Sequence, residues 1–110
     1  MAKAKTPVEV LKAMEWIITN VGWCQWVTYR DKTGRFIGED DEIDASKLGS
    51  VCLSGAMLLT NANWQAIIRA TELFREVNKI GMVAFNDAPG RTKKQVINAL
   101  RKAIKKGSKK

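Results

Sequence analysis

The spacing of apolar residues near the start of the chain predicts an amphipathic helix. Between residues 8 and 21, apolar side chains recur three and four positions apart, which places on one face Val8, Leu11, Met14, Ile17, Ile18 and Val21. The helix start is marked by Thr6 as a capping residue, by Pro7 at the first helical position and by Glu9, which completes a capping box. Gly22 predicts the end of the helix, because glycine turns left-handed without strain.

The next segment changes from helical to extended patterning. Residues 23–29 are rich in aromatic and β-branched side chains, and residues 31–34 have the composition of a tight turn. Residues 35–37 could pair back across that turn, which predicts a short β-hairpin. An acidic loop, residues 39–44, follows.

Three segments in the middle of the chain carry most of the remaining apolar residues. Residues 51–59 are apolar nearly all round, so that periodicity fits a buried helix or a buried strand, although their last four residues favour a helix. Residues 64–80 follow a long helical pattern that ends at Gly81, with one predicted face formed by Trp64, Ile67, Ile68, Thr71, Phe74 and Val77. Residues 82–85 resemble a short linker, extended or in a single turn, and residues 86–90 a loop.

A final helix is predicted from a second capping box, formed by Thr92 and Gln95. Its apolar stripe contains Val96, Ile97, Leu100, Ala103 and Ile104, and Gly107 predicts its end. The whole pattern predicts a mainly α fold, with about four helices around one core and a short β-hairpin between the first two. We expect a single globular domain over residues 1–107 and a short basic tail over residues 108–110.

The net charge of +8 is concentrated in this last segment. Up to Gly90 there are ten Lys and Arg against eleven Asp and Glu, whereas from Arg91 onward there are nine Lys and Arg and no acid. The candidate binding residues for nucleic acid or another partner are Arg91, Lys94, Arg101, Lys102, Lys105 and Lys106. Because lysine acts as a point charge, we expect any nucleic-acid contact to involve phosphates and to weaken with salt. Solubility alone could also explain the charge.

The residue types that are missing argue against catalysis. The 110 residues contain no histidine, and there is no phosphate-binding or dinucleotide-binding glycine motif. We therefore predict no enzymatic activity, no metal site and no cofactor; Cys24 is the nucleophile that an enzymatic alternative would use. Cys24 and Cys52 are expected to be reduced core residues, with a disulfide between them as the alternative. The acidic loop lacks a calcium-binding pattern, but it could contact the basic helix of a second copy and form a homo-oligomer.

The chain has four tryptophans, which we expect to lie mostly in the core: Trp16, Trp23, Trp26 and Trp64. An exposed tryptophan would be the first candidate for an anchor in a protein interface, because tryptophan is enriched at such positions.

Several short elements together resemble a family of short uncharacterised bacterial and phage proteins, a domain of unknown function. The resemblance is carried by residues 22–25, Arg30 and Asp31 with Gly34, Cys52 with Gly55 and Ala56, and residues 85–92. It spans most of the chain and implies a shared fold but no mechanism. It also suggests a structural motif of five residues: Trp23, Cys24 and Gln25 with Asn86 and Asp87. In this motif the Asn-Asp pair caps or bridges to the Trp-Cys-Gln segment and holds the last helix against the core.

These observations favour a non-catalytic binding or accessory protein that acts through protein–protein contacts. A phage origin would suit a virion component or an inhibitor of a host defence complex. The alternative is a nucleic-acid-associated protein that binds phosphates non-specifically through its basic last helix. We expect a cytoplasmic location, since no apolar run is long enough to span a membrane and the first residues lack the apolar segment of a secretory signal.

Overall fold

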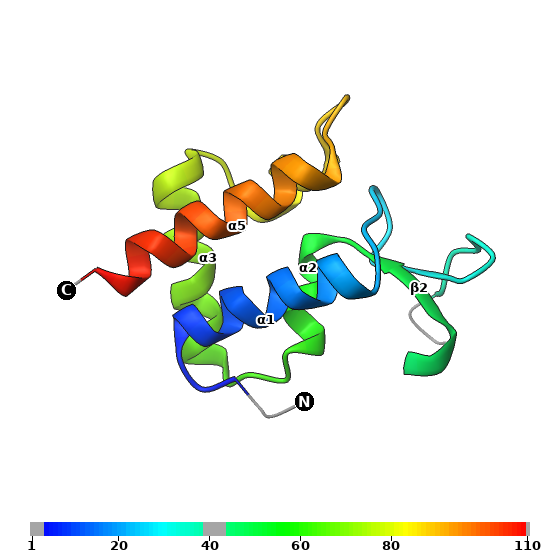
Figure 1. Cartoon of the computed structure of the whole chain (residues 1–110), viewed down its shortest axis with the longest axis horizontal. Coiled ribbons are helices and arrows are strands. Elements are labelled where there is room, and N and C mark those ends of the chain that lie inside the picture. Colours follow the sequence, from blue (N-terminus) through cyan, green and yellow to red (C-terminus); the bar gives the residue numbers. More distant parts are fainter. Residues whose placement is uncertain (1–3, 39–43, 110) are drawn as a thin grey trace.

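The computed structural model describes residues 4–38 and 44–109. Within these residues the chain forms five α-helices (Figure 1): α1 (Pro7–Asn20), α2 (Leu53–Leu59), α3 (Trp64–Asn78), α4 (Met82–Asp87) and α5 (Lys93–Ser108). Two short antiparallel strands lie between α1 and α2, and a 3-10 turn precedes the second: β1 (Tyr29–Asp31), η1 (Ala45–Lys47) and β2 (Leu48–Val51). The predicted mainly α fold with a small hairpin after the first helix is confirmed. The extra helix, α4, is the segment for which the sequence allowed a linker or a single turn.

The core lies where α1, α3 and α5 pack together, with α2 closing one side. Figure 1 shows α5 lying along α1, with α3 crossing behind them. The largest fully buried apolar side chains come from all four helices and from β2: Phe74, Leu11, Met14, Ile18, Leu53, Leu100, Val10, Val51 and Val96. Burying one such side chain contributes about 1.5–3 kcal/mol, so this cluster is the main source of stability.

The local signals at both long-helix starts are confirmed. The Thr6 hydroxyl accepts a hydrogen bond from the Glu9 amide (3.1 Å), and the Glu9 carboxylate accepts one from the Thr6 amide (2.9 Å). The same reciprocal pair joins Thr92 and Gln95, at 3.2 and 3.1 Å. Each pair satisfies two amide groups that a helix start would otherwise leave unpaired.

The strand partners differ from the predicted hairpin. The turn at residues 31–34 is present, but β1 pairs mainly with β2, and its pairing with the 35–37 segment is a single bridge between Arg30 and Phe36. Residues 23–28 are not a strand. A Cβ atom on Gly49 would lie 2.3 Å from the Asp31 carbonyl oxygen, so the missing side chain at Gly49 lets the two backbones approach. Because Gly49 and Asp31 are 18 positions apart, this close approach could not be predicted from local sequence.

The buried face of α3 is rotated from the predicted one. Trp64 and Ile68 are exposed, while the buried residues are Ala66, Ile67, Ala70, Leu73 and Phe74. Ala66 and Ala70 belong to the buried core cluster, so the buried face of α3 contains small residues while the larger Trp64 and Ile68 stay exposed. The helix ends at Asn78, and Lys79 rather than Gly81 adopts the left-handed cap (φ +64°).

Gly107 does not end the last helix, because α5 continues to Ser108. A Cβ atom at this position would lie 2.8 Å from Val8 Cγ2 and 2.9 Å from Leu73 Cδ1. Its small size thus allows α5 to lie close to α1 and α3. None of the helices in the described part of the chain is long and apolar enough to cross a membrane.

Candidate functional site

Asn86, at the end of α4, is the centre of a buried hydrogen-bond network. Its amide oxygen accepts from the Trp23 indole nitrogen (2.7 Å) and from the Leu53 backbone amide (3.0 Å). Its amide nitrogen donates to the Cys24 carbonyl (3.1 Å) and to Oδ1 of Asp87 (2.9 Å). Asn86 is 1% exposed, and these four bonds use its full donor and acceptor capacity. One side chain therefore joins the loop after α1, the start of α2 and the end of α4.

The neighbouring residues of the expected motif add a second set of contacts between the same segments. Nε2 of Gln25 donates to the carbonyls of Asn86 (3.0 Å) and Ala88 (2.9 Å). Oδ1 of Asp87 accepts from the Trp26 backbone amide (2.8 Å), and the Trp26 indole donates to the Asp87 carbonyl (3.3 Å). The structure thus brings together all five residues of the sequence-derived motif. That they hold the last helix in place stays a prediction.

Trp26 is not a strand residue but part of the loop after α1 that Asp87 holds by hydrogen bonds. Its backbone has φ +70°, a conformation that is uncommon for bulky side chains, and its side chain is 69% exposed. The cost of such a conformation is on the order of 1–3 kcal/mol, and the hydrogen bonds to Asp87 hold the backbone there. The loop therefore keeps a large apolar ring in solvent on a fixed backbone.

A shallow surface continues from Trp26 across α2 and α4. A hollow of about 190 Å³ is lined by four apolar residues and four polar ones: Trp26, Val27, Cys52 and Val83, with Thr28, Ser54, Asn86 and Asp87. Ser54 and Val83 also border a larger groove of about 390 Å³ with Met57 and Ala84. Val83 is itself strongly exposed. Two of the other tryptophans, Trp16 and Trp64, are exposed as well, so the expectation of mostly buried tryptophans is wrong.

Both cysteines are free and have local structural contacts. Burial is the main cause that raises the pKa of the Cys24 thiol, with Cys52 and Asp87 adding to the shift. A thiol with a raised pKa stays protonated at neutral pH, which makes it a poor nucleophile. Sγ of Cys52 accepts a hydrogen bond from the Gly55 amide (3.3 Å) and caps the first turn of α2. In the described part of the chain, no three acidic or cysteine side chains are grouped as metal ligands would be.

The six predicted cationic residues are divided among several surfaces. Four of them line one groove of about 560 Å³ between α5 and the α3–α4 connection: Arg91, Arg101, Lys102 and Lys105. Lys106 borders a different hollow beside the start of α1, and Lys94 is exposed on the first turn of α5. Arg101 forms an ion pair with Glu15 of α1. Within the residues that line the groove there is no carboxylate.

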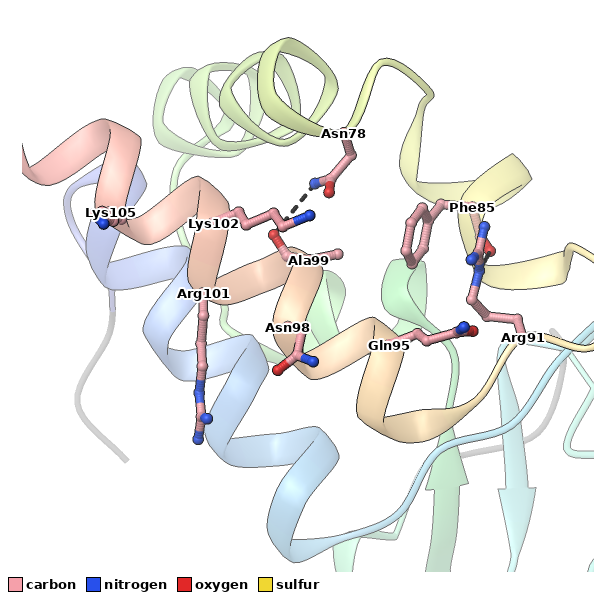
Figure 2. A pocket seen from close by; sticks show the side chains of 9 residues that line it. All are labelled: Asn78, Phe85, Arg91, Gln95, Asn98, Ala99, Arg101, Lys102 and Lys105. Atoms are coloured by element: carbon pink, nitrogen blue, oxygen red, sulfur yellow. Dashed lines mark hydrogen bonds between the residues drawn. The ribbon is translucent and has the colours of Figure 1, made fainter.

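Figure 2 shows the groove with Phe85 at one end. The Arg91 guanidinium lies over one face of the Phe85 ring, 3.6 Å from its centre, and Nε of Arg91 donates to the Phe85 carbonyl (2.7 Å). On the other side of the ring is the space bordered by Asn78, Ala99 and Lys102. The Asn78 amide fixes this wall, since it donates to the Ala99 carbonyl (3.2 Å).

Neither Phe85 nor Val83 was given a binding role from the sequence, where Phe85 was singled out only as the first residue of the 85–92 element. Their segment looked like a linker, although Gly81 followed by apolar residues at 82 and 85 is compatible with a short helix. Spacing of three between Met82 and Phe85 is the signal that could have placed both on one face of α4. No local signal marks the positive φ of Trp26.

No curated protein and no solved structure matches the chain. A family model described as a family of unknown function matches residues 2–106, nearly the whole chain. The chain therefore belongs to this family of unknown function, DUF6197.

Proposed function

We propose that this protein is a non-catalytic binding protein that acts by contact with another protein, with Trp26 as the anchor. The observation that carries the proposal is the exposed Trp26 ring on a left-handed backbone held by Asp87. Strain of this kind persists only where the surroundings enforce it, and it is frequent at functional sites.

The surface around Trp26 has the features of a small interface centre. Tryptophan is enriched among residues that dominate binding energy, and such residues occupy sites with shallow apolar pockets nearby. Apolar surface around the ring comes from Val27, Met57 and Val83, while polar groups come from Ser54 at the shared border of the two hollows and from Asp87, Glu72 and Arg75 in their linings. The hydrogen-bonded loop is preorganised, which reduces the entropy lost on binding.

The narrower expectations stay predictions. They are a phage origin, a role as virion component or inhibitor of a host defence complex, and a cytoplasmic location. A homo-oligomer through the acidic loop also stays a prediction, because residues 39–43 of that loop lie outside the described residues.

The proposal is tested by affinity capture from the native host, with nuclease present, using the wild-type protein, Trp26→Gly and Trp16→Ala. Trp26→Gly removes the ring and suits the positive φ, so the loop should keep its fold. Trp16→Ala is the control, since it removes an equally large exposed ring from α1. We expect Trp26→Gly to weaken capture of the protein partner at least about 30-fold, the fold-change equivalent of the roughly 2 kcal/mol lower limit for a binding hot spot.

Two results would contradict this function. One is capture that survives Trp26→Gly unchanged. The other is an equal loss of capture with Trp16→Ala, which would show that the exposed tryptophans bind non-specifically. Circular dichroism of each variant confirms that the fold is retained.

A second candidate function is association with nucleic acid through α5. It is favoured by the groove that four cations and no carboxylate line. Removing the last residues would be a poor test, because Gly107 packs against Val8 and Leu73. Instead, Lys102 and Lys105, two of the four cations that line the groove, should be changed together to Gln. We expect weaker binding to an oligonucleotide and a flatter salt dependence; an unchanged affinity would refute this candidate.

A further inference from the structure

We infer that the groove between α3, α4 and α5 binds single-stranded nucleic acid, with a base stacked on Phe85 and the flanking phosphates on Lys102 and Lys105. This inference rests on the second candidate function and makes it more specific. It changes the sequence-based expectation, in which only phosphates would be contacted.

The aromatic end of the groove is a ring held by two contacts. Phe85 and the buried Phe74 form a T-shaped pair, with ring centres 5.4 Å apart and planes at 87°. The Arg91 guanidinium lies over one face of the Phe85 ring, 3.6 Å from the ring centre. Phe85 also lines the groove together with Ala99 and Lys102, so part of the ring is accessible from the groove. A ring fixed in this way can stack a base without losing conformational freedom.

The cations of the groove are not equivalent. Arg101 is engaged by Glu15, and Arg91 is held by the Phe85 ring and carbonyl. Among the residues that the structure describes, no carboxylate forms an ion pair with Lys102 or Lys105. These two lysines lie three positions apart on the exposed side of α5, so both can face a strand that runs along the helix. They are therefore the groove cations that can neutralise phosphates.

The shape and chemistry favour a single strand over a duplex or an acidic peptide. The volume of about 560 Å³ falls in the range of pockets for small organic ligands, roughly 300–1,000 Å³, which suits one exposed nucleotide. Bases in a duplex are already stacked and could not reach Phe85. An acidic peptide would satisfy the lysines, but it would leave the aromatic face without a planar partner.

The test measures fluorescence anisotropy of a short labelled oligothymidylate with the full-length protein over a salt series. The variants are Lys102→Gln with the control Lys94→Gln, and Phe85→Leu with the control Phe36→Leu. Lys94 is on the same helix but outside the groove, and Phe36 is an exposed ring far from it in sequence. We expect Lys102→Gln to weaken binding more than Lys94→Gln and to lower the salt slope by about 0.7.

Phe85→Leu should weaken binding about five- to 150-fold, the fold-change equivalent of losing one base–aromatic stack. Because Phe85 also packs on Phe74, Phe85→Leu is expected to lower stability as well, so base stacking is also tested with the wild-type protein and an abasic oligonucleotide of equal charge. The abasic strand should bind more weakly than the intact one. Duplex DNA and poly-glutamate should compete less well than the single strand.

The outcomes separate the two ideas. If the intact oligonucleotide does not bind, both the second candidate function and this inference fail. If it binds but the abasic strand, the duplex or poly-glutamate binds equally well, phosphate contact remains and the base-stacking groove is wrong. If Lys94→Gln is as harmful as Lys102→Gln, the whole face of α5 binds and the groove does not.

Discussion

The Asn86 network and the outer face of α5 are both polar, but their polar groups are used in opposite ways. Every donor and acceptor of Asn86 is engaged within the protein, and its side chain is buried. Lys102 and Lys105 are exposed and form no ion pair with the described residues. The residues of the Asn86 network therefore have a structural role, because they join three segments of the chain. The lysines of α5 add little to the stability of the fold, so their charges are available to solvent or to a partner.

The difference teaches how to separate structural from binding roles in this protein. Buried polar groups are costly to leave unpaired, about 1–3 kcal/mol each, so changes in the network should act on stability. Exposed charges contribute little to stability, so changes on α5 should act on binding alone. Trp26 belongs to both classes, because its backbone is part of the network while its ring is in solvent.

The largest effect is expected for Asn86→Ala. This change removes four hydrogen bonds and leaves the Trp23 indole, the Leu53 amide and the Cys24 carbonyl without their partner. We expect the free energy of unfolding to fall by about 2–5 kcal/mol, measured by urea denaturation. The matched control is Asn98→Ala on α5, an exposed asparagine for which we expect a change within about 0.5 kcal/mol. Similar losses for both variants would remove the distinction between the two regions.

The parts of this fold that could be predicted are those determined by neighbours in sequence. The capping boxes at Thr6 and Thr92 join residues three positions apart, and the apolar stripes of α1 and α5 follow from helical periodicity. Such features need no knowledge of the tertiary structure.

The remaining features depend on contacts that the sequence does not localise. Asn86 meets Trp23 across 63 positions, and the loop composition of residues 86–90 gave no indication that Asn86 and Asp87 belong to a helix. On α3, the periodic pattern predicted a buried face that contains the large apolar residues Trp64 and Ile68. In the structure these two residues are exposed, and Ala66 and Ala70 are buried in the closely packed core. The groove at Phe85 was missed for the same reason, since it forms only when α3, α4 and α5 meet.

An intermediate effect is expected for Asp87→Ala, at the edge of the network. Oδ1 of Asp87 accepts bonds from the Trp26 amide and from Asn86, so its loss frees the strained loop but leaves the other bonds of Asn86 in place. We expect the free energy of unfolding to fall by about 1–2 kcal/mol, measured by thermal and urea denaturation. Asp87→Asn is the paired variant, because its amide keeps one acceptor oxygen and should recover part of the loss. Unchanged stability of Asp87→Ala would show that this contact does not hold the loop.

The smallest effect on stability is expected for the double change Lys102→Gln and Lys105→Gln. Neither lysine packs in the core, and removing two like charges from a chain of net charge +8 slightly relieves repulsion along α5. We expect the free energy of unfolding to change by no more than about 0.5 kcal/mol in urea denaturation. Arg101→Gln is the informative control on the same helix, because it breaks the ion pair with Glu15 and should cost about 0–1 kcal/mol, less at high salt. A loss above about 1 kcal/mol for the double variant would mean that these lysines have a structural role, and the contrast with Asn86 would then fail.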